Sequence, residues 1–96
     1  MSSFDAELWN VESMGSWVFI TLPRDLSQAI RDVPRPPEPG FGSLRVVARI
    51  GATEWRTSIF PEAKTGCYVL PVKKAVRAAE GISLGDTVTA SVTLVD

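Results

Sequence analysis

The chain has 96 residues, of which 45% are hydrophobic and 22% are charged, and its formal net charge is −1. These values predict a single globular domain, residues 1–96, and exclude the strongly basic balance that draws a protein to nucleic acid or to an anionic membrane. Histidine is absent, which removes the commonest general base and the commonest metal ligand.

Cys67 is the only cysteine, so an internal disulfide cannot form. A lone thiol fits a reducing compartment. No apolar run approaches the roughly 18 residues needed to span a bilayer, and the N-terminus lacks the basic-then-apolar pattern of a signal peptide. We therefore expect a cytoplasmic protein that is not bound to a membrane.

Two strands are predicted at the start of the chain. Residues 4–11 alternate between apolar and polar side chains, which indicates a half-buried strand. Residues 16–22 are rich in aromatic and β-branched side chains, and Gly15 marks a turn before them, so we expect an antiparallel hairpin. Pro23 cannot donate to a strand ladder and ends the second strand. The side chains expected on one face of the first strand are Phe4, Ala6 and Leu8.

A short helix is predicted to run to residue 32, with Asp25 or Ser27 as its N-terminal cap. Pro34 stops the helix, and residues 34–42 contain four prolines. This segment predicts an extended, polyproline-like crossover between the halves of the domain, although a proline-rich motif for a partner protein would have the same composition. The apolar stripe of the helix is expected to consist of Leu26, Ala29, Ile30 and Val33.

The second half of the chain contains four further strands and a second helix. Period-two alternation indicates the strands, and Pro71 and Gly81 mark the start and the end of the helix. The apolar stripe of this helix is expected to consist of Val72, Ala75, Val76 and Ala79. In chain order, the elements are strand 44–50, strand 53–60, strand 67–70, helix 72–80 and strand 87–95.

About six short strands with two short helices predict a mainly β fold, a small closed or split β-barrel whose helices cap its ends. Leu22-Pro23 and Leu70-Pro71 each follow a strand and precede a helix. This repeated order of strand, Leu-Pro and helix predicts a pseudo-two-fold internal repeat. Residues 1–33 form one half, residues 34–42 the crossover and residues 43–96 the other half.

The segment after the second helix reads Gly81-Ile82-x-x-Gly85-Asp86-x-Val88. A strand, a Leu-Pro step and a helix precede this segment. The whole order of elements looks like the swapped-hairpin barrels of bacterial transition-state regulators and antitoxins. Those proteins dimerise and bind DNA, and the likeness covers the fold alone.

Glycines, aromatic residues and prolines recur along the whole chain in a specific order: Gly15, Trp17, Pro23, Gly51, Trp55, Thr57-Ser58-x-Phe60-Pro61, Gly66-x-Tyr68-x-Leu70-Pro71-Val72-Lys73, Val76-Arg77 and Gly85-Asp86-x-Val88. With this set the chain resembles the bacterial family called domain of unknown function 1905 (DUF1905). The resemblance implies a compact split β-barrel with helical caps, related in fold to the swapped-hairpin barrels. It implies no established activity.

Basic residues gather on the predicted helix 72–80, and aromatic residues lie on the two strands before it. Residues four apart share a helix face, so the basic side chains of Lys73 and Arg77 are neighbours. An aromatic wall beside a cationic edge is typical of a pocket for an anionic ligand, whereas a solvated helix face and a packed core explain the same residues without a function. The predicted ligand-binding residues are Trp55, Arg56, Tyr68, Lys73 and Arg77, with Lys74 beside them.

Catalytic candidates have little support in the sequence. Cys67 has no histidine to activate it, and Ser58 or Thr57 would act as a nucleophile only with Lys73 as the base. The aspartates and glutamates are scattered and form no metal-binding loop. We therefore predict no catalytic residue, no metal site and no cofactor.

Three functions remain open. We expect a non-catalytic binding module for an anionic small ligand or for a partner protein. The alternative is a DNA-associated dimeric regulator of the swapped-hairpin type, a class that the net charge of −1 does not favour. An enzyme that works without histidine would have to draw its acid and base from Asp, Glu, Lys, Tyr or Cys.

Overall fold

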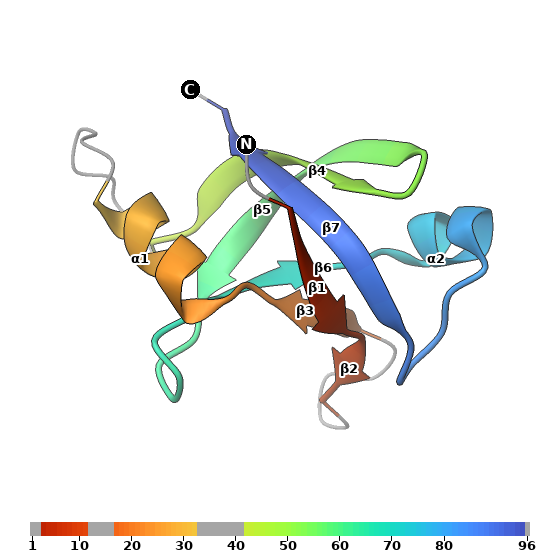
Figure 1. The fold of residues 1–96 in the computed structure, drawn as a ribbon, viewed down its shortest axis with the longest axis horizontal. Helices are drawn as coiled ribbons and strands as arrows, with labels where there is room; N and C mark the ends of the chain where they lie inside the picture. The colour runs from red at the N-terminus through yellow and green to blue at the C-terminus, as the bar shows by residue number, and fades with distance from the viewer. Residues whose placement is uncertain (1–2, 12–16, 33–41, 96) are drawn as a thin grey trace.

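The computed structural model describes residues 3–11, 17–32 and 42–95 of the chain. Within these ranges, seven strands form one antiparallel sheet in the order β1-β7-β4-β5-β6-β3-β2, accompanied by two helices (Figure 1). The elements in chain order are β1 (Ser3–Glu7), β2 (Trp9–Asn10), β3 (Val18–Thr21), α1 (Arg24–Arg31), β4 (Leu44–Ile50), β5 (Thr53–Pro61), β6 (Tyr68–Pro71), α2 (Lys74–Glu80) and β7 (Thr87–Leu94).

The sheet closes on itself at Leu8. β1 and β2 stand at opposite ends of the strand order, yet only this residue separates them in the chain. The Leu8 N–H donates to the Asp86 carbonyl at 2.9 Å, and the Leu8 carbonyl accepts from the Gly85 N–H at 2.9 Å. The Leu8 side chain is 1% exposed. The predicted small β-barrel is therefore confirmed as a nearly closed one. The predicted strand 4–11 is divided into β1 and β2, which brings the strand count to seven.

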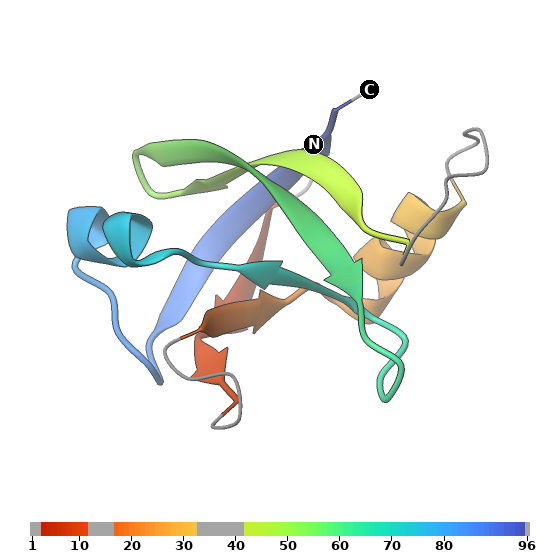
Figure 2. The same cartoon turned by 180° about the vertical axis from the view of Figure 1, so that it is seen from behind.

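β3 and β6 pair antiparallel, with Ile20 opposite Leu70. Each of these strands leads through a Leu-Pro step toward a helix: Pro23 directly precedes α1, and Pro71 is the last residue of β6. Because the two strands run in opposite directions, α1 and α2 lie at opposite ends of the barrel, as both the front and the back views show (Figures 1 and 2). The order of strand, Leu-Pro and helix thus occurs twice.

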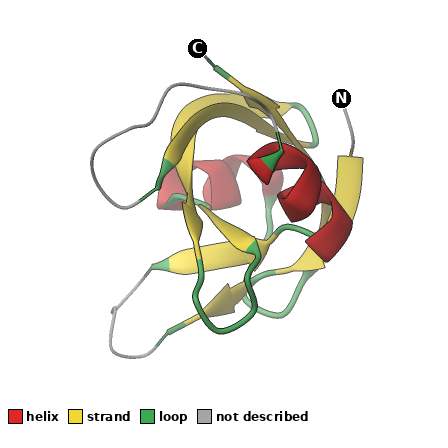
Figure 3. Cartoon of the chain, turned by 90° about the vertical axis from the view of Figure 1, so that its left-hand side faces the viewer, coloured by secondary structure: helices red, strands yellow, loops and turns green. Residues whose placement is uncertain are grey.

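The predicted alternation is confirmed where a strand has one face on the core. β4 and β7 bury every second side chain, and β5 buries Trp55 and Ile59 on its inner face. Figure 3, which views the molecule from the side of α1, shows the strands wrapped around a common centre. That centre holds the inner-face residues Leu44, Val46, Ala48, Ile50, Val88, Ala90 and Val92.

α1 differs from its prediction at both its start and its buried face. The helix begins after Pro23, and no side-chain hydrogen bond caps it, so the prediction of Asp25 or Ser27 as a cap is wrong. Ile30 is buried as expected, but Ala29 is exposed and Ser27 is fully buried. The reason is that the Ser27 hydroxyl has a partner on β6.

α2 begins at Lys74, two residues later than expected, because Val72 continues the β3–β6 ladder and its N–H donates to the Val18 carbonyl at 2.8 Å. Val76 is buried, whereas the two alanines of the predicted stripe, Ala75 and Ala79, are exposed. The predicted C-terminal cap is confirmed, since Gly81 has φ 64° and lies in the left-handed region.

Parts of the prediction lie outside the described residues. They are Val33, nearly all of the crossover 34–42, and the turn at Gly15.

The buried hydroxyl of Ser27 gives a test of how α1 is attached to the barrel. The Tyr68 N–H donates to Ser27 Oγ at 3.0 Å. Ser27→Ala leaves this buried N–H without an acceptor, which should lower the free energy of unfolding by about 1–3 kcal/mol. Urea unfolding measures the loss, with Ser83→Ala as the control because Ser83 is exposed. Equal midpoints for the two variants would show that the bond does not hold α1 in place.

Candidate functional site

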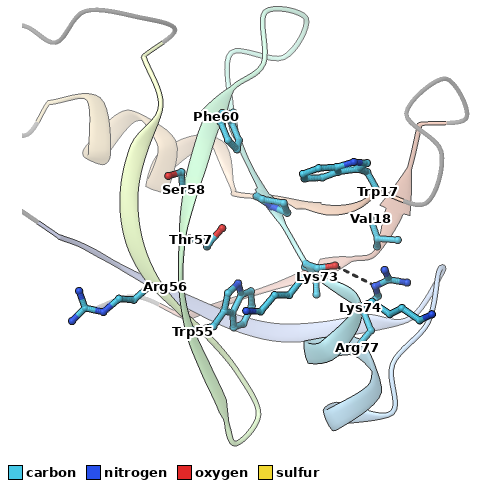
Figure 4. A pocket seen from close by; sticks show the side chains of 12 residues that line it. Trp17, Val18, Trp55, Arg56, Thr57, Ser58, Phe60, Lys73, Lys74 and Arg77 are labelled. Atoms are coloured by element: carbon cyan, nitrogen blue, oxygen red, sulfur yellow. Dashed lines mark hydrogen bonds between the residues drawn. The ribbon is translucent and has the colours of Figure 1, made fainter.

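A pocket of about 480 Å³ lies between β5 and the segment that joins β6 to α2 (Figure 4). One wall is strand β5, the other is the start of α2, and the end of the pocket is the chain that enters β3. The residues that line it are Trp17, Val18, Trp55, Arg56, Thr57, Ser58, Phe60, Pro71, Val72, Lys73, Lys74 and Arg77.

The structure brings four of the five predicted site residues to this pocket: Trp55, Arg56, Lys73 and Arg77. Tyr68 lies elsewhere. Its ring is 4% exposed within the core and packs beneath the Arg31 guanidinium, whose Cζ lies 5.5 Å from the ring centroid. Successive side chains of a strand alternate between its faces, so Tyr68 and Pro71 lie on opposite faces of β6, and of these two residues Pro71 lines the pocket.

Successive side chains of β5 point to opposite faces of the strand, which separates Trp55 from Arg56. Trp55 is 8% exposed and forms the inner wall of the pocket. Figure 4 shows Arg56 extending away from the pocket on the other side of β5, and Lys73 extending toward Trp55 from the start of α2. Arg56 therefore borders the pocket at its base, and its charge lies outside.

Arg77 is held in place by the chain that precedes its helix. Its Nε donates to the Val72 carbonyl at 3.2 Å, a bond drawn in Figure 4. The bond holds the guanidinium beside the start of α2, and among the described residues no acceptor binds its terminal N–H groups. Within the described part of the chain, no carboxylate pairs with Lys73 or Lys74, and no aspartate or glutamate lines the pocket. The electrostatic character of the pocket is therefore cationic.

The two walls of the pocket are tied together at their far ends. Thr53, the first residue of β5, donates its hydroxyl to Glu80 Oε2 at 2.5 Å, and Glu80 is the last residue of α2. Gly51, in the turn before β5, has φ 59°, and a Cβ there would fall on the Glu80 carboxylate. A glycine at this position lets α2 approach the β4–β5 turn.

Trp17 and Phe60 belong to the pocket, and neither was among the site residues predicted from the sequence. Trp17 is 55% exposed and stacks on Phe19 with 6.1 Å between ring centroids. Phe60 is 39% exposed on the outer face of β5. Period-two alternation places Phe60 on the same face of β5 as Glu54 and Arg56, so its exposure could have been inferred from the sequence. Trp17 gave no such signal, because its position depends on how β3 pairs.

The family model described as domain of unknown function, DUF1905, matches residues 4–92. The chain belongs to the DUF1905 family. A comparison with curated proteins gives no match.

In this DUF1905 chain, the catalytic candidates do not assemble. Thr57, Ser58 and Lys73 all line the pocket, but within the described residues no hydrogen bond joins either hydroxyl to the lysine. Cys67 is 7% exposed and lies outside the pocket, with its Sγ 3.9 Å from the Thr65 carbonyl.

The described residues contain no group of three or more Cys, Asp or Glu side chains arranged to hold a metal ion. They also contain no helix that is long and apolar enough to cross a membrane.

The tie between α2 and the β4–β5 turn can be tested with two glycines of this DUF1905 chain. Gly51→Ala and Gly81→Ala both place a side chain in the left-handed region, which costs about 1–2 kcal/mol each. Only the Gly51 variant also displaces the Glu80 carboxylate, since nothing lies within 4 Å of a Cβ at Gly81. Gly51→Ala should therefore lose more stability in thermal unfolding. Equal losses would mean that the Glu80 contact contributes nothing.

Proposed function

We propose that this protein is a non-catalytic binding module of the bacterial cytoplasm, whose pocket takes an anionic group carried by a small ligand or by a partner protein. One observation carries the proposal: besides Arg56, the basic residues Lys73, Lys74 and Arg77 line the same pocket as three aromatic residues, and no acidic residue among the described ones lines it. The buried free thiol of Cys67 suits a reducing compartment.

The cationic side supplies attraction for a negative charge. Guanidinium and ammonium groups make charge-assisted hydrogen bonds to carboxylates and phosphates, which are stronger than neutral ones. Lys73 and Lys74 are exposed, so solvent and salt screen their contribution. Binding should therefore weaken as ionic strength rises, and Arg77, which is half-buried and held by Val72, should be screened least.

The aromatic side supplies apolar contact. Trp17 and Phe60 are large and exposed, and Trp55 lines the same pocket beside the Lys73 side chain (Figure 4). Aromatic rings bury large areas when a ligand covers them, and pockets with an apolar lining and a few polar groups are typical of ligand sites. The favoured ligand therefore carries an apolar body next to its negative charge.

A binding role agrees better with this pocket than catalysis does. Its hydroxyl groups, on Thr57 and Ser58, have no hydrogen-bonded base among the described residues, and the chain contains no histidine. General acid–base catalysis needs a proton acceptor within hydrogen-bond reach of the group that reacts. The pocket offers positive charge and apolar area instead.

Titration with phenyl phosphate, an anion with an aromatic body, tests the proposal. Trp17 and Trp55 line the pocket, so binding should change the tryptophan fluorescence. Lys73→Ala removes a charge-assisted contact and should weaken binding about tenfold at low salt. Lys64→Ala is the matched control, because it removes the same charge from an exposed loop residue outside the pocket.

Two results would count against this function. One is the absence of any fluorescence change with phenyl phosphate, benzoate and indole-acetate at low ionic strength. The other is an equal effect of Lys73→Ala and Lys64→Ala, which would mean that net charge, and not the pocket, attracts the anion.

A further inference from the structure

The pocket follows the edge of a strand. Four consecutive residues of β5 line it, from Trp55 to Ser58. Because side chains alternate between the two faces of a strand, a cavity on one face is reached by every second residue only. Figure 4 shows Trp55 and Thr57 on the pocket side of β5 and Arg56 and Ser58 on the other side. A cavity bordered by both sets lies beside the backbone itself.

That backbone edge has no partner strand in the described part of the chain. β5 pairs with β4 from Thr53 to Ile59, but its pairing with β6 comprises only Phe60 and Pro61. The ladder continues past the strand end, where the Glu62 N–H donates to the Cys67 carbonyl at 2.9 Å.

Peptide groups that point toward the same neighbour recur at every second residue of a strand. Glu62 and Phe60 direct their peptide groups toward β6. Two and four residues before Phe60, Ser58 and Arg56 therefore direct their N–H and C=O groups to the same side of β5. The ladder between β4 and β7 supports this parity, since the Val95 N–H donates to the Arg45 carbonyl and Arg45 stands opposite Ser58. Arg45 therefore turns its peptide groups away from Ser58, whose own groups point into the pocket.

Pro71 explains why the ladder ends here. The register places Val69 opposite Phe60, so Pro71 would stand opposite Ser58. Proline has no N–H, and it cannot donate to the Ser58 carbonyl. The next residue, Val72, donates to Val18 of β3 instead. The chain thus turns away from β5 at Pro71 and leaves a wedge between the two strands.

We propose that an extended acidic peptide segment of a partner protein binds in this wedge as an additional strand along β5. The Arg56 and Ser58 N–H and C=O groups would pair with its main chain, in the manner of β-augmentation. A carboxylate side chain of the segment would reach Lys73 and Arg77, and an apolar side chain would lie on Trp55 or Phe60. The inference rests on the proposed function and names the partner for the same pocket.

Charge and geometry together favour a peptide over a compact anion. Among the described residues the lining is basic and contains no acidic side chain, so it is complementary to an acidic segment. A compact anion would use the charges and leave the Arg56 and Ser58 peptide groups without a partner, whereas a strand uses both. Two pairing residues at about 3.4 Å per residue correspond to a bound segment of roughly four residues.

The first experiment uses the full chain and the peptide acetyl-Val-Asp-Phe-Asp-Val-amide. Two N-methylated forms are compared, one methylated on the first, third and fifth residues and the other on the second and fourth. An added strand turns alternate N–H groups to β5, so one form should lose at least tenfold in affinity by calorimetry and the other should bind close to the parent. Bound peptide should also slow hydrogen exchange of the Arg56 and Ser58 amides.

Several outcomes would overturn the inference. Equal affinity for both methylated forms, with no protection of the two amides, would show that side chains alone hold the peptide. Binding of phenyl phosphate without binding of the peptide would refute the inference of a peptide partner and leave the proposed function intact. If neither phenyl phosphate nor the peptide binds, both the peptide inference and the proposed function are wrong. Amides already protected in a dimer of the free chain would identify a second copy as the occupant.

A variant supplies an independent measurement. Ser58→Pro removes the N–H at the open edge and keeps the β4 ladder, because Ser58 does not donate to β4. Ser58→Ala keeps the N–H and measures the contribution of the side chain. We expect peptide affinity to fall a further three- to tenfold from the alanine to the proline variant. Equal affinities would contradict main-chain pairing, and the methylated peptides remain decisive where the proline variant does not fold.

Discussion

Pro71 has no amide hydrogen, and the ladder between β5 and β6 ends where that hydrogen would be needed. This short ladder is the joint between the two halves of the sheet order, β1-β7-β4-β5 on one side and β6-β3-β2 on the other. Because the strands separate there, the barrel has a mouth on that side. α2 follows directly, so its basic residues are carried to the mouth by the same turn of the chain that creates it.

The opposite joint of the barrel is built differently. At Leu8 the chain passes from one half of the sheet to the other without a loop, and two backbone hydrogen bonds to the segment before β7 close the seam. The side chain of Leu8 is buried behind it. One joint is therefore sealed by backbone pairing and an apolar residue, and the other is held open by a proline. The pocket lies at the open joint because β5 lacks a partner strand there within the described part of the chain.

Sequence patterns predicted the strands that bury one face and missed features that depend on distant residues. β4 and β7 alternate cleanly because core and solvent lie on opposite sides of them. β6 is buried on both faces, so its sequence carried no sign of which way Tyr68 would point, and its placement in the site was not anticipated correctly. The burial of Ser27 depends on the Tyr68 N–H, which is 41 residues away, and no local pattern could reveal it.

The residues of the pocket divide in the same way, into those that a local pattern predicts and those that depend on distant residues. Lys73 and Arg77 were predicted together because helix spacing is a local property. Trp17 joins them only through the pairing of β3 with β6, and the open edge of β5 follows from a register that no single strand displays. The sequence thus identified the charges, whereas the backbone donors and acceptors beside them became visible only once the strands were assembled.

The pairing of β1 with β7 has a consequence for how the protein is made. The Thr89 hydroxyl donates to Asp5 Oδ1 at 2.6 Å across 84 residues of sequence. Ribosomes add roughly 5–20 residues per second, so β1 leaves the ribosome several seconds before its partner exists. Loop closure over such a span is slow compared with local pairing. The barrel therefore completes its fold after β7 is synthesised, and until then β1, with Phe4, lacks its partner strand.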